Sequence, residues 1–291
     1  MKGKERRKYT LNDYEKVLAL RAQNLSYNKI SNIVDVSSTT VQNWISTSRK
    51  PRALYAKRQE KPVLNSARKL SIELAYIYGV LIGDGNIERR ERTWRINLNV
   101  KDIDFAQEFA RNLHLWSGLK PTIRSRTQVH NHQTKYGDWI KGRSEYTVVR
   151  LNSKQAVTFL LSRIKCKTYD WEIPKDILKC KNKQIIYSFI KGIFDSEGYP
   201  IYSGRNRRVE LEMLGELGVP QLQRLLETVG IESTITQGKK QKLKGTYVLR
   251  ILRQRSIQEF RDNINFSIER KRSKLNRMLN SYKRKTYKPE T

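Results

Sequence analysis

The sequence predicts an α+β protein in which a small all-α domain precedes two similar, pseudo-symmetric halves, each ordered αββαββα. Three observations support this fold class. The apolar segment AYIYGVLIGDGNI returns as SFIKGIFDSEGYP, with its glycines and its last acid in register. After both copies, polar and apolar residues alternate as they do in half-buried strands. Residues 1–50, in contrast, show only a helical spacing of apolar residues.

The charge of the chain narrows its possible partners. Its 291 residues include 59 Lys and Arg against 28 Asp and Glu, a formal charge of +31. Such a chain repels itself unless it meets a polyanion, so nucleic acid is the expected partner. An anionic membrane surface is the alternative, but the sequence has no apolar run long enough to span a bilayer and no signal peptide. Two cysteines, Cys166 and Cys180, make neither a disulfide framework nor a zinc site, and we expect a reduced, cytoplasmic protein.

Changes of composition divide the chain into four parts. We assign residues 1–50 to the helical domain and residues 51–70, with two prolines and many cations, to a basic linker. The first repeat then covers residues 71–166. The second covers residues 167–291 and ends with a basic helix at about residues 269–282.

Three helices are expected in the N-terminal domain. Thr10 can cap the first of them, with Asp13 three residues later. A second, short helix is expected to hold Ile30 and Ile33, and a third helix is expected to carry Val41, Trp44 and Ile45 inward.

The string SYNKISNIVDVSSTTVQNWI resembles the helix-turn-helix pattern of small DNA-binding modules. In such modules the recognition helix enters the major groove by its N-terminal residues. A plain three-helix cap is the alternative, but the positive charge of the chain favours DNA binding. The outward groups available for phosphates and base edges are Ser38, Thr39, Thr40, Gln42 and Asn43.

The two repeats place the same elements in the same order. Superposing Gly79 on Gly192 aligns Asp84 with Glu197 without a gap. In each half an alternating strand follows, then a helix, two more strands and a closing helix. The apolar positions of the alternating strands are Trp94, Ile96, Leu98 and Val100 in the first half and Val209, Leu211 and Met213 in the second.

The repeated segments predict a pair of buried helices. Each segment is hydrophobic nearly all round, so it belongs in an interface. Gly79 and Gly192 would let the two helices lie close together. Gly85 and Gly198 would end them, where a positive φ angle costs glycine little.

Pairing the helices would bring Asp84 and Glu197 together at one end. Two adjacent carboxylates repel each other and therefore attract cations. Oxygen ligands at an open site suit Mg²⁺, which keeps waters and accepts phosphate oxygens. A cation there can activate water for in-line attack on phosphorus and stabilise the leaving oxygen. The alternative is that both acids are surface residues that end helices.

The strings IYGVLIGDG (77–85) and IKGIFDSEG (190–198) resemble the motif of the LAGLIDADG homing endonucleases. Ile82 stands where the family string has its first Asp, whereas the second copy keeps an acid there, Asp195. The resemblance covers both halves of residues 71–280. It implies the duplicated endonuclease fold with curved antiparallel sheets, and a monomer that cuts double-stranded DNA at a long, specific, non-palindromic site. An intron-encoded or free-standing homing enzyme would fit.

The resemblance also implies roles for particular residues. Asp84 and Glu197 would hold Mg²⁺, or Mn²⁺ in its place, with Gly83 and Ser196 as neighbouring ligands. The family adds a basic residue near each scissile phosphate. The segments IKCKTYDWEIP and NINFSIERKRSKL indicate Lys167, with Lys165 in reserve, and Lys271, with Lys274 in reserve. Each of these lysines could equally be a phosphate clamp or a solvated charge.

The polar faces of the strands are expected to read the DNA, because a two-stranded ribbon fits the major groove. Lys101 follows the first alternating strand, where the family often has a polar residue near the active-site water; Leu214 holds the matching place. Glu210 and Glu212 either accept from cytosine or pair with arginines. The polar loop HNHQTKYGDWIKGRS is expected to fold over DNA or to stay mobile. Candidate DNA contacts are Arg95, Asn97, Asn99, Lys101, Arg124, Arg126, Arg150, Lys239, Lys240 and Arg250.

Two other functions remain open at this point. The chain could be a DNA-binding regulator that has lost the chemistry, although such a protein need not retain both acids. It could also be an RNA-binding intron-splicing maturase, which would bind structured RNA and cut no DNA.

Overall fold

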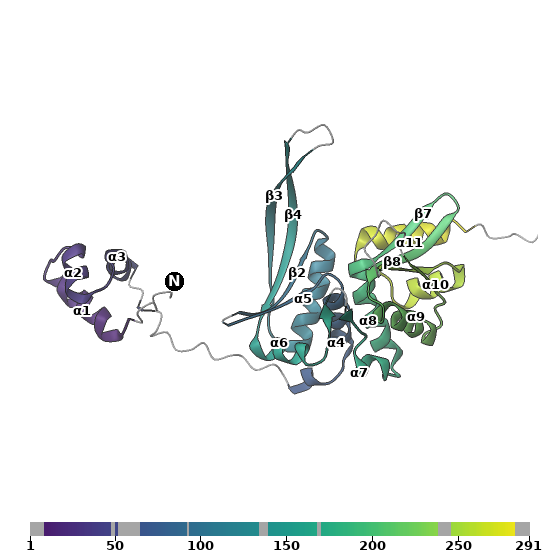
Figure 1. Cartoon of the computed structure of the whole chain (residues 1–291), viewed down its shortest axis with the longest axis horizontal. Coiled ribbons are helices and arrows are strands. Elements are labelled where there is room, and N and C mark those ends of the chain that lie inside the picture. The colour runs from purple at the N-terminus through teal and green to yellow at the C-terminus, as the bar shows by residue number, and fades with distance from the viewer. Residues whose placement is uncertain are drawn as a thin grey trace, which may run out of the picture. The chain divides into compact units, whose positions relative to one another are not determined.

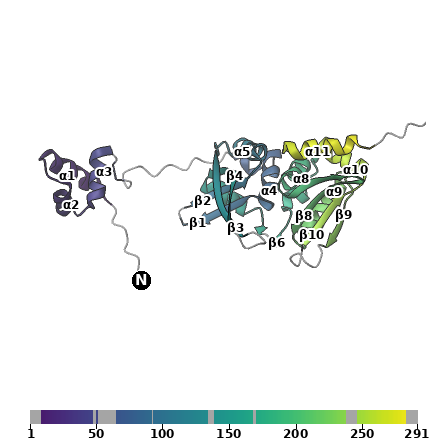
Figure 2. The same cartoon turned by 90° about the horizontal axis from the view of Figure 1, so that it is seen from above.

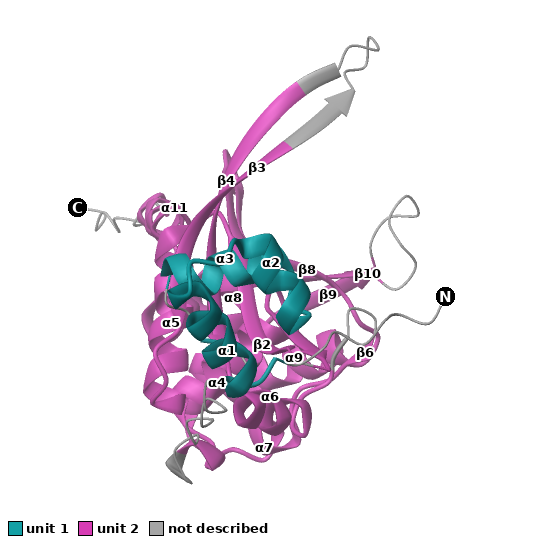
Figure 3. Cartoon of the chain, turned by 90° about the vertical axis from the view of Figure 1, so that its left-hand side faces the viewer, with its two compact units in different colours: residues 1–60 teal, residues 61–291 magenta. Residues whose placement is uncertain are grey.

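A computed structural model describes residues 9–47, 50–51, 65–91, 93–133, 139–167, 170–237 and 246–282. The chain forms two compact units, residues 1–60 and residues 61–291 (Figure 3). Among the described residues, we find no helix with the length and apolar character needed to cross a membrane.

The first unit consists of three helices: α1 (Leu11–Ala22), α2 (Tyr27–Val34) and α3 (Ser38–Thr47). The expected capping box is present, since Thr10 Oγ1 accepts from Asp13 N at 3.2 Å and Asp13 Oδ2 accepts from Thr10 N at 2.7 Å. Such a cap satisfies amide groups that the first turn of a helix leaves free. The buried residues of this unit are Tyr14, Val17, Ile30, Val34, Val36, Val41 and Trp44.

Helix α2 holds Ile30 and Ile33 as expected, but the side chain of Ile33 is 59% exposed. Val34, four residues after Ile30, lies on the inward face of α2 instead. Asp35 then turns the chain with a φ of 55°, which ends α2 and brings Val36 into the core. Ile45 packs against the same core but is only partly buried.

The second unit contains both repeats (Figure 1). The first repeat runs through η2 (Asn65–Arg68), α4 (Ile72–Ile82), β1 (Asn86–Arg90), β2 (Thr93–Val100), α5 (Ile103–Ser117), β3 (Thr122–Gln133), β4 (Trp139–Asn152) and α6 (Lys154–Leu161). A connection follows, with β5 (Cys166–Lys167), β6 (Asp170–Trp171) and α7 (Lys175–Leu178). The second repeat runs through α8 (Lys183–Glu197), β7 (Gly198–Ser203), β8 (Asn206–Leu214), α9 (Gly218–Thr228), β9 (Thr234–Gln237), β10 (Thr246–Ile251), α10 (Gln254–Asn263) and α11 (Glu269–Asn280).

The repeats form two antiparallel four-stranded sheets with the same topology. Their strand orders are β1-β2-β4-β3 and β7-β8-β10-β9. One face of each sheet packs against helices in a single hydrophobic core, which includes the expected Ile96, Leu98, Val209 and Leu211. Figures 1 and 2 show α4 and α8 side by side between the two sheets. The α+β fold with two equivalent halves is therefore confirmed.

Two strands were not located by the alternation of polar and apolar residues. These are β1 and β7, which directly follow the two repeated helices and pair with β2 and β8. Strand β1 reads NIERR, with Ile87 as its single apolar residue, so it carries almost no alternating pattern. Its position is set by the hairpin with β2, in which Asn86 lies opposite Asn97.

The prediction of a polar loop near residue 130 is wrong in part. Strand β3 continues to Gln133 and β4 begins at Trp139, with these two residues paired. The two strands form a long antiparallel ribbon that extends beyond the helices (Figure 1). Residues 134–138 lie outside the described residues. Alternating strand residues on a two-stranded ribbon need no core to pair, which explains how so polar a segment forms strands.

The end of the expected linker packs against the second unit. Ala67 in η2 is 3% exposed, and its carbonyl oxygen accepts a hydrogen bond of 2.8 Å from Trp116 Nε1 in α5. Residues 65–70 therefore belong structurally with the first repeat.

The expected close crossing of the two repeated helices is confirmed. A Cβ atom built on Gly79 would lie 2.8 Å from Ile193 N and closer still to Phe189 O. A Cβ atom on Gly192 would likewise overlap Tyr76 O and lie 3.0 Å from Val80 N. The two backbones are in contact at these glycines, and no side chain fits between them.

The reason expected for glycine at positions 85 and 198, a positive φ angle, is wrong. Gly198 has a φ of −84°, and Gly85 is not among the positive-φ glycines. These positions require glycine because a Cβ atom would collide with neighbouring atoms. A Cβ atom on Gly85 would lie 2.9 Å from Leu81 Cα, and one on Gly198 would lie 2.8 Å from Phe194 O. At both positions the chain turns back against the last turn of its own helix as it enters the first strand.

Gly79→Ala should destabilise the second unit by about 1–3 kcal/mol, because the helices must separate to admit the methyl group. Urea unfolding of the full-length protein would measure this change. Gly204→Ala is the comparison, since a Cβ atom there meets nothing within 4 Å and the cost is limited to a φ of +57°. Such backbone strain costs about 1–2 kcal/mol. Equal stability of wild type and Gly79→Ala would contradict the close crossing.

Candidate functional site

The two acids of the repeated segments meet where α4 and α8 end. A Cβ atom on Gly83 would overlap Ser196 Cβ and lie 3.3 Å from Glu197 Cγ. The chain leaving α4 therefore touches the last turn of α8. Asp84 follows Gly83 directly, so the close crossing of the helices brings its carboxyl near that of Glu197.

Burial and neighbouring charge change the ionisation of the two carboxyls. Burial raises the pKa of Glu197 to about 7, and the charge of Asp84 contributes to that rise. Asp84 is exposed as a residue, but partial burial of its carboxyl raises its pKa as well. Lys271 opposes both shifts. A cation bound between the two carboxyls would likewise favour their ionised forms.

Lys271 lies at this acid pair and is only 6% exposed. Its Nζ donates to Asp195 O at 2.6 Å and to Phe194 O at 3.4 Å, in the last turn of α8. Burial lowers the pKa of Lys271 to about 8, while the nearby acids Asp195, Asp102 and Asp84 favour the charged form. The expected second-repeat lysine is therefore brought to the site.

The other three candidate lysines differ in position. Lys167 belongs by its backbone to β5, opposite Asp170, but its side chain lies outside the described residues. Lys165 is exposed and forms an ion pair of 2.8 Å with Glu172, which raises its pKa. Lys274 is half-buried on α11. Of the candidate lysines whose side chains the structure describes, Lys271 is the one that lowers the pKa values of Asp84 and Glu197.

The donor set at the acid pair fits a hard divalent cation. Asp84 and Glu197 supply carboxylate oxygens, and Gly83, directly before Asp84 in the chain, supplies a backbone oxygen. Ser196 Oγ donates to Gly192 O at 3.1 Å, which leaves its oxygen free to accept or to ligate. Within the described ranges, no group of three or more His, Cys, Asp or Glu side chains is arranged so that it could hold a metal ion by itself. Two carboxylates at an open site suit Mg²⁺ or Mn²⁺, which complete their coordination with water and phosphate oxygens.

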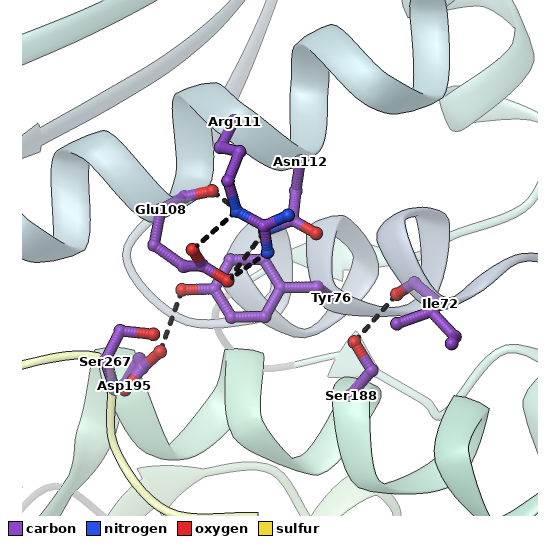
Figure 4. Close-up of polar contacts among 8 residues, drawn as sticks. All are labelled: Ile72, Tyr76, Glu108, Arg111, Asn112, Ser188, Asp195 and Ser267. Carbon is purple, nitrogen blue, oxygen red and sulfur yellow. Dashed lines mark hydrogen bonds and ion pairs between the residues drawn. The ribbon is translucent and has the colours of Figure 1, made fainter.

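Asp195, the other acid of the second copy, lies away from this donor set. Its side chain is 1% exposed, inside the interface between α4 and α8. Asp195 Oδ2 accepts from Tyr76 OH at 2.8 Å, and Oδ1 accepts from Ser267 N at 2.7 Å (Figure 4). Its pKa is raised by burial. Sequence reasoning noticed this acid but not its partners.

The polar face of the first sheet collects most of the expected DNA contacts. The register pairs Asn97 with Arg150 and places Arg95 opposite Asn152 on the same face. Within the described structure, Asn97 Oδ1 and Arg150 Nε are buried without a hydrogen-bond partner. A groove of about 310 Å³ on this face is lined by Arg95, Thr122, Arg124, Ser125, Arg126, Val148, Arg150 and Asn152. Asn99 is exposed on β2.

On the matching face of the second sheet, a glutamate of the sheet pairs with two of its arginines. Glu210 is 6% exposed and accepts from Arg208 Nε at 2.7 Å, Arg250 Nε at 2.8 Å and Tyr199 OH at 3.0 Å. Burial works against ionisation of Glu210, but the hydrogen bonds from both arginines lower its pKa overall. Of the two expectations for this glutamate, pairing with neighbouring arginines is confirmed. Arg250 is thus engaged by Glu210 and by Thr236 Oγ1 at 2.6 Å.

The remaining candidate contacts are placed as follows. Lys101 is exposed, with Nζ 5.7 Å from the centre of the Tyr146 ring. Lys239 and Lys240 lie outside the described residues. In the first unit, Ser38, Thr39, Gln42 and Asn43 are exposed on α3. Thr40 is half-buried, with its hydroxyl 2.8 Å from that of Ser37.

Comparison with known proteins gives a family for the second repeat. Residues 185–265 match the family described as LAGLIDADG-like domain. An uncharacterized protein of Methanocaldococcus jannaschii is 29% identical over 284 residues, covering 91% of this chain and 92% of the relative.

Two solved structures are similar in fold. The homing endonuclease I-WcaI, bound to its DNA recognition sequence, is 15% identical, with a TM-score of 0.50 over 77% of this chain and 96% of I-WcaI. I-DmoI in complex with DNA and Mn is 20% identical, with a TM-score of 0.44 over 67% of this chain and 97% of I-DmoI. The similarity to I-WcaI confirms the expected LAGLIDADG endonuclease fold.

Stability without metal should fall as the pH rises from about 4.5 to about 7. In this window the folded protein retains a proton on Glu197 that the unfolded chain, with the ordinary pKa of 4.5, releases. Folding then takes up a proton, so the free energy of unfolding decreases with pH. Urea unfolding in EDTA would measure the slope.

Glu197→Gln should flatten this pH dependence. Glu232→Gln, which removes an exposed partner of Arg253, is the control and should leave it unchanged. Mg²⁺ should restore more stability at pH 7.5 than at pH 5, because the cation competes with the proton. An unaltered slope in Glu197→Gln would exclude this acid as its source.

Proposed function

We propose that the chain is a site-specific homing endonuclease that cuts double-stranded DNA with a divalent cation, Mg²⁺ or Mn²⁺; the match of residues 185–265 to the LAGLIDADG-like domain family supports this proposal. One observation carries the proposal: the glycine crossing of α4 and α8 brings Asp84 and Glu197 together at one open end of the helix pair. Burial and the charge of Asp84 raise the pKa of Glu197, and a bound cation would offset both effects.

The residues of the acid pair have defined tasks in such a reaction. Asp84 and Glu197 would hold the cation, which stabilises charge on the attacking and leaving oxygens of a phosphodiester. Lys271, with a pKa of about 8, is mainly protonated at neutral pH. Its ammonium group would place a positive charge beside the scissile phosphate without a large change of structure. Lys167 would serve the first repeat in the same way.

The sheets would bind the DNA on their polar faces. Four arginines line the groove of the first sheet, and Arg is the usual partner of guanine O6 and N7 in the major groove. Asn97 beside Arg150 offers an amide for adenine. The two sheets carry different side chains within one chain. A monomer of this kind would recognise a non-palindromic site, unlike a symmetric dimer.

The three helices of the first unit would bind DNA next to the cut site. The exposed side chains of Ser38, Thr39, Gln42 and Asn43 begin α3, where a helix-turn-helix module contacts bases and phosphates. A tethered second reader raises affinity through effective concentration and takes no part in the chemistry.

Asp84→Asn and Glu197→Gln should each slow cleavage at least about 100-fold. Specific DNA affinity should stay within a few-fold, because many Lys and Arg contacts supply it. The substrate would be DNA sites selected by cleavage from a random library in the presence of Mg²⁺. Single-turnover cleavage and binding in EDTA would separate the two effects.

The same experiment distinguishes the other functions. A DNA-binding regulator would retain selected sites without cutting them in Mg²⁺ or Mn²⁺. A maturase would bind structured RNA tightly and yield no cleaved DNA. Full cleavage by either acid variant would remove that acid from the mechanism.

Gln42→Glu combined with Asn43→Glu should shorten the DNase I footprint at one end of the site. Two added carboxylates at the start of α3 repel phosphates, so the first unit should detach from DNA while the second unit still cuts. Asn12→Asp combined with Ala19→Glu makes the same charge change at exposed positions of α1 and is the control. Identical footprints for the wild type and both variants would mean that these helices form a cap and do not contact the DNA.

A further inference from the structure

The short segment at residues 267–271, which we term the clasp, is bound from both repeats at once. Ser267 N donates to Asp195 Oδ1 at 2.7 Å, and Glu269 N donates to Asp104 Oδ2 at 2.6 Å. Arg270 donates to the two oxygens of Asp102, each at 2.7 Å. Asp195 ends α8 of the second repeat, whereas Asp102 and Asp104 begin α5 of the first.

The contacts from the first repeat also stabilise the start of α11. The first amides of a helix have no partner within the helix, and negative charge is favourable there. Asp104 supplies both the acceptor and the charge for Glu269 N, from a position 165 residues earlier in the chain. Asp102 pairs with the guanidinium of Arg270 through two parallel hydrogen bonds, a geometry that fixes direction as well as distance.

The contact from the second repeat is buried. The carboxylate of Asp195 accepts hydrogen bonds from Tyr76 OH in α4 and from Ser267 N in the clasp, so it links α8 to both of these segments (Figure 4). Phe266 and Ile268, on either side of Ser267, are 0% and 2% exposed and anchor the clasp in the core.

The clasp directs Lys271 into the last turn of α8. Its Nζ donates to the carbonyl oxygens of Asp195 and Phe194, and it lies 5.5 Å from the centre of the Phe266 ring. The same lysine acts on the ionisation of both Asp84 and Glu197. The position of this ammonium group is thus determined by residues from both halves of the protein.

The acid that anchors the clasp has no equivalent at the matching position of the first repeat. Ile82 occupies the position that matches Asp195, and it is a buried apolar residue with no group to accept from a passing backbone. This anchor is therefore a property of the second repeat.

We propose that Asp102, Asp104 and Asp195 are positioning residues, which hold Lys271 at the acid pair only when both repeats are docked together. As a contribution to cleavage, this inference rests on the proposed function. The position of Lys271 itself can be tested without any activity.

The first test measures how accessible the Lys271 amine is in the full-length protein. Acetic anhydride labels free amines, and peptide mass spectrometry gives the rate at each lysine. In the wild type, Lys271 should react about tenfold more slowly than Lys274, a half-buried residue of the same helix, because it must first be released by local opening. Asp102→Ala combined with Asp104→Ala should remove most of this protection and leave Lys191 unchanged.

Two variants control this test. Asp104→Asn keeps an oxygen that accepts from Glu269 N, so it should restore protection relative to Asp104→Ala. Glu232→Gln breaks an exposed ion pair elsewhere and should have no effect. Both changed aspartates lie at the rim of the interface, so the fold should persist; unchanged protection in the double alanine variant would overturn the proposal.

The second test compares single-turnover cleavage of a selected DNA site. The double alanine variant should cut about 10- to 100-fold more slowly, with DNA affinity within about threefold, because a small displacement of a charged group has such an effect. In a Lys271→Met background the same two substitutions should cause no further loss. A loss of equal size in that background would show a merely structural role and overturn the proposal. Absence of cleavage by the wild type would count against the endonuclease function, and amine labelling would still judge the clasp.

Discussion

The contact between α4 and α8 at Gly79 and Gly192 determines the geometry of the second unit. Because two backbones touch there, the helices can neither slide nor separate by the width of a side chain. Gly83 consequently meets Ser196, and the two acids follow at one end. The sheets begin immediately after the acids, so the same crossing also determines the positions of β1 and β7. Few other sites in a protein transmit a methyl-sized constraint over so many elements.

The repeats share this frame but differ in the chemistry they present. The pair Asn97 and Arg150 in the first sheet corresponds to Glu210 and Arg250 in the second. One arginine has a buried nitrogen without a partner among the described residues, and the other is held by a carboxylate. Duplication has preserved the apolar face of each sheet, where packing limits change, while the polar faces have become two different surfaces.

Sequence reasoning reached the helix pair and its acids because repetition, glycine spacing and charge are local properties of the chain. It located Lys271 through a resemblance, and the alternation of polar and apolar residues did not locate β1, whose five residues hold a single apolar side chain. It explained Gly85 by a positive φ angle. The actual reason, that a Cβ atom would collide with Leu81, is visible only in the folded structure. The hydrogen bond from Glu269 to Asp104 joins residues 165 apart, and no periodicity in the sequence indicates such a partner.

The ribbon formed by β3 and β4 has a consequence for how this protein can evolve. Residues 124–129 of β3 are exposed on both faces, so neither the core nor the helix crossing depends on them. Substitutions at exposed positions usually alter stability by less than about 0.5 kcal/mol. A lineage could therefore exchange these side chains with little effect on folding, whereas substitutions around the crossing would disturb the packing of the whole unit.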